Sequence, residues 1–330
     1  MKSIDHYTKL LLKDKDLQNP NSFEELGYIF FGPLVFNFFI WLKLEITNCD
    51  IILFNSREGY FLKQIYELFK SKYNLPDSVY FKTSRKISSI ASLFTREDIY
   101  NTFNSHRYSG SLSNLMKDRF GIKCNNEKHI DTLKEIPNID EYVEVILENA
   151  QRVRNEYGKY VKSVISDYKN IVMIDSGYQG TTQYNLQKAF ELNVRGRYIS
   201  YKGNKNLSDV KGLYDFEKTN FQKNIIFFES IFTDKVGSYI NIINNEFINE
   251  NIELTNQYFE EKTKIIDGIK LFINHMFCFI FDENSASYEY SDYLFELMCK
   301  KDFIKNEKLF DIFFHDNYYV RDSLKKIQRQ

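Results

Sequence analysis

The fold is decided by residues 50–59, DIILFNSREG, in which a short apolar run passes directly into a polar loop. Asp50–Asn55 is predicted to be a strand that is apolar on both faces, as is typical of a parallel sheet covered by helices on both sides. Apolar residues then recur at helical spacing over residues 60–69, and Ser78–Lys82 is the next predicted strand. Strand, helix and strand together form one predicted β–α–β unit.

The same design returns in residues 171–182, IVMIDSGYQGTT. Ile171–Ile174 is predicted to be a buried strand, Thr181–Leu192 the helix that follows it, and Gly196–Tyr201 a further strand. Strands that alternate with helices predict an α/β fold with a parallel sheet and a doubly wound, Rossmann-like core.

Helices are expected around this core. A Ser-x-x-Glu capping box at residues 22–25 precedes a long apolar helix that ends near Ile46. Residues 87–170 are predicted to be a mostly helical insertion, and the tail from about Tyr239 is also predicted to be helical. We therefore expect an α/β catalytic core over residues 1–240 and a helical region packed on it over residues 241–330.

Composition excludes several classes of protein. The 330 residues carry a formal net charge of −1, so the chain lacks the basic field with which proteins bind nucleic acid. Its four cysteines and five histidines are scattered without zinc-ligand spacing, which indicates reduced thiols in a cytoplasmic protein. The apolar residues 28–42 are interrupted by glycine, proline and asparagine and are shorter than the about 20 residues of a membrane span. They predict a buried helix, with an interfacial helix at the inner membrane face as the alternative.

Two polar loops follow the two apolar strands. In open α/β sheets, ligands bind beyond the carboxyl ends of the strands, so both loops are placed to form one site. Arg57 offers a planar fork for phosphate oxygens, and the helix after Gly59 begins with free N–H groups that favour an anion. In the second loop, Asp175 can accept ribose hydroxyls or hold a Mg²⁺-bound water, and the threonines can take a phosphate. The predicted ligand-binding residues of the two loops are Ser56, Gly59, Ser176, Gly177, Gln179, Gly180, Thr181 and Thr182.

Further charges flank these loops. Lys82, Arg85 and Lys86 end the second predicted strand, where three cations suit a diphosphate and a solvated loop is the alternative. His106-Arg107 and Asp118-Arg119 either line an acceptor groove or are solvated charges at helix ends.

The second loop resembles the signature of type I phosphoribosyltransferases. In that signature a strand ends in two acidic residues, and Thr-Gly-x-Thr then surrounds the ribose 5-phosphate. Asp175 takes the second acidic position, Gly180 the glycine and Thr182 the final hydroxyl, whereas Ile174 replaces the first acidic residue and Tyr178-Gln179 replace small residues.

The chain also resembles a bacterial group encoded with cell-surface polysaccharide genes, whose members often lie beside or are fused to a haloacid-dehalogenase-type phosphatase. The resemblance covers roughly residues 26–240. It rests on Gly32-Pro-Leu, Phe54–Leu62 (FNSREGYFL), Ile174–Thr181 (IDSGYQGT), Glu229 and Gly237-Ser238.

This resemblance implies transfer of 5-phosphoribose from phosphoribosyl pyrophosphate, with Mg²⁺, to a glycan or lipid-linked glycan. A separate phosphatase would then remove the 5-phosphate. Arg57, Arg85 and Lys86 would stabilise the pyrophosphate, and Asp175 would orient the ribose and contact the metal or its water. Glu58 is the expected base, with Asp175 and Glu229 as alternatives and helix capping as a second role for Glu58.

Two other functions stay open. A dehalogenase-type phosphatase needs a strand that ends in Asp-x-Asp, but Asp175 is followed by Ser-Gly, and Asp14-Lys15-Asp16 lies in the polar N-terminal part. The chain is alternatively a non-catalytic subunit of a polysaccharide assembly complex, which Ile174 at a normally acidic position favours.

Overall fold

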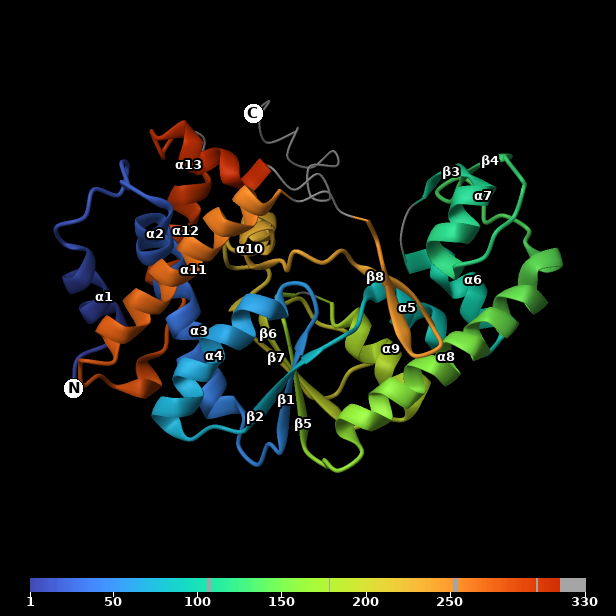
Figure 1. Ribbon diagram of the computed structural model, residues 1–330, viewed down its shortest axis with the longest axis horizontal. Helices are drawn as coiled ribbons and strands as arrows, with labels where there is room; N and C mark the ends of the chain where they lie inside the picture. The colour runs from blue at the N-terminus through green and yellow to red at the C-terminus, as the bar shows by residue number, and fades with distance from the viewer. Residues whose placement is uncertain (106–107, 178, 252–254, 301, 315–330) are drawn as a thin grey trace.

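The computed structural model describes residues 1–105, 108–177, 179–251, 255–300 and 302–314, and its centre is a five-stranded parallel sheet (Figure 1). The strand order is β2-β1-β5-β6-β7, so β1 and β5 lie next to each other near the middle. The predicted α/β fold with a parallel sheet is confirmed. The strands are β1 (Ile51–Asn55), β2 (Asp77–Phe81), β5 (Ile171–Asp175), β6 (Val194–Tyr201) and β7 (Val210–Asp215).

Alternate side chains of the central strands enter two separate cores. Ile52 and Phe54 of β1 belong to one core, whereas Ile51 and Leu53 belong to the other. Both faces of the sheet are therefore covered, which is the physical reason for the uninterrupted apolar runs in β1 and β5.

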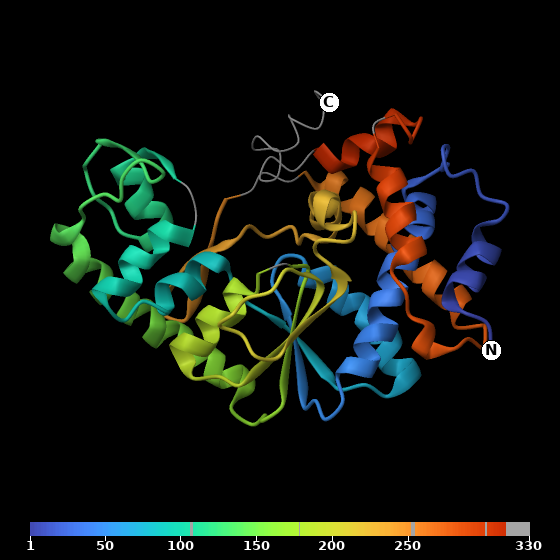
Figure 2. The ribbon, with the colours of Figure 1, turned by 180° about the vertical axis from the view of Figure 1, so that it is seen from behind.

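The first core joins the N-terminal and C-terminal helices on one face of the sheet (Figure 2). These helices pack across one another although they are far apart in sequence. They are α1 (Ile4–Leu12), α2 (Phe23–Leu26), the π-helix Gly27–Phe31, α3 (Gly32–Glu45), α4 (Gly59–Tyr73), the 3-10 turn Gln222–Asn224, α10 (Ile225–Phe232), α11 (Asn256–Met276), the 3-10 turn Glu283–Ser285, α12 (Glu289–Cys299), α13 (Glu307–Asp311) and the 3-10 turn Ile312–Phe314.

Glycines allow α11 to cross the N-terminal helices at very short range. A Cβ atom on Gly268 would lie 1.8 Å from the carbonyl oxygen of Glu24, and one on Gly27 would lie 2.0 Å from that of Ile265. Any side chain at these two positions would force the backbones apart. The crossing therefore depends on glycine in both helices.

The predicted capping box is half formed. The Ser22 hydroxyl accepts a hydrogen bond from the N–H of Glu25 at 3.1 Å, but the Glu25 carboxylate accepts from the N–H of Asn21 at 2.8 Å. The helical segment that follows, Phe23–Glu45, is long and apolar enough to cross a membrane. The protein buries 89 % of its most apolar 18-residue window, as expected for a helix packed in a core.

The second core lies on the other face and extends into the insertion. The insertion is mostly helical as predicted, but it also contains an antiparallel strand pair that was not predicted. Its elements are α5 (Arg85–Ala91), α6 (Arg96–Ser105), β3 (Ser109–Ser111), α7 (Leu112–Leu115), the π-helix Met116–Phe120, β4 (His129–Asp131), the 3-10 turn Asp140–Tyr142 and α8 (Val143–Ile165); α9 (Thr181–Phe190) covers the same face.

The prediction of a helix from Tyr239 is wrong at its start. β8 (Tyr239–Ile243) and β9 (Glu246–Asn249) form an antiparallel hairpin there. Asn244 and Asn245, at its two-residue turn, both have positive φ angles, 51° and 66°. Asparagine tolerates this conformation, and such turns match the twist of the two strands, so the Asn-Asn pair favours a hairpin over a helix.

Candidate functional site

The two predicted loops meet at the carboxyl edge of the sheet. β1 and β5 are parallel neighbours, so Asn55 and Asp175 end side by side, and the Asn55 amide donates to Asp175 Oδ2 at 2.8 Å. The side-chain oxygen of Asn55, Oδ1, is buried without a hydrogen-bond partner among the described residues. Sequence reasoning placed Asn55 in the loop but did not select it for the site.

Three carboxylates gather around this contact. The hydroxyl of Ser176 donates to Glu229 Oε1 at 3.1 Å and lies 3.5 Å from Asp175 Oδ1. Burial, followed by the negative charge of Glu58, raises the pKa of Asp175 to about 6 and that of Glu229 to about 8. Arg85 acts in the opposite direction on both carboxyl groups.

The pKa is raised further at Glu229 than at Asp175. Of the two carboxyl groups, Glu229 is therefore the better proton donor and Asp175 the better acceptor. Two carboxyl groups joined through one serine hydroxyl can therefore both accept and supply a proton in the same site.

Arg57 is held in a left-handed backbone conformation with φ 76°, which costs about 1 kcal/mol for a residue with a side chain. Its N–H donates to the Tyr80 hydroxyl at 3.3 Å, and that hydroxyl donates to Asp234 Oδ2 at 3.0 Å. The N–H of Asp234 returns to the Arg57 carbonyl at 3.2 Å, and Arg57 Nη1 donates to Ser238 Oγ at 3.3 Å. Tyr80 and the segment 234–238 thus fix Arg57; Tyr80 and Asp234 carried no signal in the sequence.

Ser56 and Gly59 have structural roles. The Ser56 hydroxyl accepts from the N–H of Thr83 at 3.0 Å and also contacts the Thr83 carbonyl, which ties the ends of β1 and β2 together. A Cβ atom on Gly59 would lie 2.8 Å from the carbonyl carbon of Phe54. Gly59 is therefore required by the packing of α4 on β1. Glu58 directly precedes α4, but its side chain does not cap that helix.

The second loop leads into the ten-residue helix α9. Gly180 has φ 66° and precedes the helix, and Thr181 and Thr182 form its first turn with half-buried side chains. A Cβ atom on Gly177 would lie 2.9 Å from the Ser200 carbonyl oxygen, so β6 requires glycine there. Gln179 is exposed, and its carbonyl accepts from the Asn204 amide at 3.0 Å.

The predicted cations separate into two groups. Arg85, at the start of α5, acts electrostatically on Asp175 and Glu229. Lys86 is not brought to the carboxylates, because its Nζ donates to the Lys117 carbonyl at 2.9 Å. In the insertion, Arg119 is likewise engaged, with the Thr102 carbonyl at 2.9 Å. His106-Arg107 and Tyr178 lie outside the described residues.

Within the described residues, no group of three or more His, Cys, Asp and Glu side chains is arranged to hold a metal ion. A comparison with models of known protein families finds no match for this chain, and a comparison with curated protein sequences finds none either.

Proposed function

We propose that this chain is a glycosyltransferase that moves a 5-phosphoribosyl group from phosphoribosyl pyrophosphate to a hydroxyl of a glycan or lipid-linked glycan. The observation that carries the proposal is the meeting of the two loops at one edge of the parallel sheet, where Asn55 contacts Asp175. A carboxylate at a strand end, a helix N-terminus, the buried Arg57 and the exposed Arg85 are groups that suit a sugar phosphate with a diphosphate leaving group.

The roles of the residues follow from their surroundings. Arg57 and Arg85 would stabilise the negative charge that develops on pyrophosphate as its bond to the ribose carbon breaks. Thr181 and Thr182, in the first turn of α9, would hold the 5-phosphate, and Asp175 would accept the ribose hydroxyls. The acceptor hydroxyl loses its proton as it bonds to the ribose carbon, and Asp175 or Glu58 would receive it. Glu229 has the more strongly raised pKa, so it suits the role of donor better than that of base.

Mg²⁺ fits this site as a partner of the diphosphate. Asp175 and the buried Oδ1 of Asn55 are oxygen ligands of the kind that Mg²⁺ or its bound water prefers. We expect these two residues to meet the ion when it enters with the donor. When bound, Mg²⁺ supplies positive charge that stabilises the leaving group.

One observation favours a non-catalytic subunit as the second candidate. Ile174, at the position that is acidic in the phosphoribosyltransferase signature, is fully buried in the core. Only one carboxylate then remains at the strand end to hold the ribose. For the phosphatase alternative, Asp14 and Asp16 are exposed in the turns after α1 and do not end a strand.

Isothermal titration with phosphoribosyl pyrophosphate and Mg²⁺ tests the proposal directly. Binding by the native chain that is lost in Asp175→Asn would support it, and turnover with a glycan acceptor would separate the transferase from the subunit. Absence of binding by the native chain would remove the phosphoribosyl proposal. We also propose that a separate phosphatase removes the 5-phosphate from the product and that the chain acts in the cytoplasm at the inner membrane face.

A further inference from the structure

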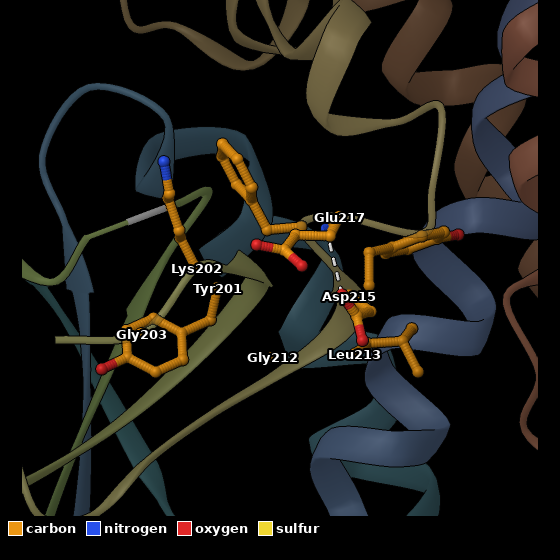
Figure 3. A pocket seen from close by; sticks show the side chains of 9 residues that line it. Tyr201, Lys202, Gly203, Gly212, Leu213, Asp215 and Glu217 are labelled. Atoms are coloured by element: carbon orange, nitrogen blue, oxygen red, sulfur yellow. Dashed lines mark hydrogen bonds between the residues drawn. The ribbon is translucent and has the colours of Figure 1, made fainter.

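A pocket of about 430 Å³ opens beside the candidate site, at the carboxyl ends of β6 and β7 (Figure 3). Its size is within the range of pockets that hold small organic ligands. Tyr201 and Lys202 come from the end of β6, and Asp215 and Glu217 from the end of β7. None of the residues selected from the sequence lines this pocket.

An aromatic ring forms part of the pocket wall. The rings of Tyr201 and the buried Tyr198 stack, with centroids 5.7 Å apart and an angle of 18° between their planes. This contact fixes the orientation of the Tyr201 ring. The half-buried Tyr201 side chain also lines the pocket, where its π-electron face can contact the C–H face of a sugar ring.

Hydrogen-bond acceptors line the pocket on the β7 side. Asp215 Oδ1 accepts from the N–H of Glu217 at 3.0 Å, shown as the dashed line in Figure 3, which fixes the turn that carries both carboxylates. Asp215 Oδ2 forms an ion pair with Lys218 Nζ at 3.1 Å, whereas Glu217 is exposed and makes no ion pair within the described part of the chain. Ionised carboxylates accept strong hydrogen bonds from neutral hydroxyl groups, so the pocket matches a hydroxylated ring.

Two glycines border the pocket. A Cβ atom on Gly212 would lie 2.7 Å from the backbone nitrogen of Tyr201, so only glycine allows these two strand ends to pack closely. Gly203 has φ 102°, and a Cβ atom there would meet nothing within 4 Å. The rim of the pocket at Gly203 is therefore bare backbone facing open space.

The pocket is linked to the candidate site. Asp175 is the register partner of Tyr198, and Tyr201 lies three residues farther along β6, roughly 10 Å at the rise of a strand. The Ser200 N–H donates to the Ser176 carbonyl at 3.1 Å, and Asn204 contacts the carbonyl of Gln179. The same segment of chain therefore borders both the pocket and the second loop.

We infer that this pocket binds an uncharged sugar ring, with Tyr201 as the stacking platform and Asp215 and Glu217 as acceptors for its hydroxyl groups. Its identification as the subsite for one sugar unit of the acceptor rests on the proposed function. Sugar binding itself does not, because the pocket lies outside the donor loops.

Saturation-transfer NMR of the full chain tests this inference, with methyl β-D-galactopyranoside, methyl α-D-mannopyranoside and methyl β-D-ribofuranoside as probes. Xylitol, an acyclic polyol, is the control ligand because it has hydroxyl groups but no ring face. We expect saturation to be transferred from the protein to at least one glycoside but not to xylitol. Tyr201→Ala should weaken that binding about tenfold, whereas Tyr201→Phe keeps the ring and most of the affinity.

Two further variants separate a loss of glycoside binding from a failure to fold. Glu217→Gln changes an exposed side chain and should also weaken glycoside binding, whereas Tyr293→Ala, half exposed on α12, should leave it unchanged. The inference would be overturned if the native protein transferred saturation to none of the glycosides. It would also be overturned if Tyr201→Ala transferred as much saturation as the native protein.

Titration with phosphoribosyl pyrophosphate and Mg²⁺ separates the two proposals. Donor binding that is unchanged in Tyr201→Ala, together with lost glycoside binding, supports a distinct sugar subsite. Glycoside binding that depends on Tyr201 in a chain that does not bind the donor would retain the sugar pocket and refute only the proposed transferase function.

Discussion

The carboxyl edge of the sheet has two different halves. At β1 and β5, buried polar side chains contact half-buried ones: Asn55 bonds Asp175, and Arg57 bonds Ser238. At β6 and β7, the strand ends open into a solvent-accessible pocket with the exposed Glu217 at its rim. The central half is built to fix charges in place, and the outer half leaves room for a ligand.

This difference follows from the positions of the strands. Both faces of the central strands are covered, so side chains at the ends of these strands lie in the low-dielectric protein interior. An unpaired charge is energetically costly there. That cost raises the pKa of Asp175 and Glu229. The outer strands end close to solvent, where Asp215 keeps its pKa below the ordinary value through a hydrogen bond from the N–H of Glu217 and contacts with Lys218.

The largest expected effect separates the two halves directly. Asp175→Asn should weaken donor binding about 100-fold, because hydrogen bonds to an ionised group contribute about 1.5–3 kcal/mol each. Asp215→Asn changes the same residue type at the end of β7 and should leave donor binding within about twofold. Titration calorimetry measures the donor affinity of both variants. An equal loss of affinity in the two would contradict the assignment of the donor site to the β1–β5 half.

The hydrogen bonds around Arg57 give the next effect. Tyr80→Phe removes the hydroxyl that joins the Arg57 N–H to Asp234, so we expect about tenfold weaker donor binding. The hydroxyl of the neighbouring Tyr60 makes no hydrogen bond within the described residues, which makes Tyr60→Phe the matched control. If both variants bind the donor like the native chain, Arg57 does not depend on Tyr80.

The raised pKa of Glu229 predicts a dependence of stability on pH. The unfolded chain releases this proton near the ordinary pKa of 4.5, whereas the folded chain keeps it up to about pH 8. The folded state binds more protons in this window, so the free energy of unfolding falls as the pH rises through it.

Glu229→Gln should remove this contribution to the pH dependence. We expect the decrease in Tm between pH 5 and pH 8.5 to be smaller by roughly 2–4 °C than in the native chain. Thermal unfolding followed by circular dichroism measures it, with the exposed Glu217→Gln as control. An unchanged slope would mean that Glu229 is ionised in the folded state at neutral pH.

The smallest effect belongs to a neighbouring pair of cations. Arg85→Met should weaken donor binding about fivefold, because Arg85 acts on both carboxyl groups from an exposed position where solvent screens its charge. Lys86→Met should change it less than about twofold, because Lys86 donates to the Lys117 carbonyl. The reverse order of affinities would place the diphosphate on the insertion side of α5.

A strand or helix could be predicted from the sequence when the signal for it lay in its own residues and those next to it. β1, β2, β5 and β6 were predicted because their apolar runs and the polar loops after them are local signals. β7 was missed because Val210–Asp215 is an outer strand with mixed side chains and only a short connection from β6. The turn at Asn244-Asn245 was a local signal for the hairpin that went unused.

The candidate site was predictable only in part for the same reason. Asp175 and the loop at residues 55–59 follow strands in sequence, so their meeting could be expected. Asp234 comes from a segment about 180 residues away from Arg57, and nothing in the spacing indicates their contact. Glu58 was expected to act as a base or a helix cap, and the capping hydrogen bond is not formed.

The crossing at Gly27 and Gly268 has a consequence for biosynthesis. The apolar surface of residues 23–45 is synthesised before α11, which covers it and is made about 240 residues later. At about 5–20 residues per second, the delay is roughly ten to fifty seconds. During that interval the nascent chain displays a segment with the length and apolarity of a membrane span, so a chaperone or a membrane surface competes with α11 for it.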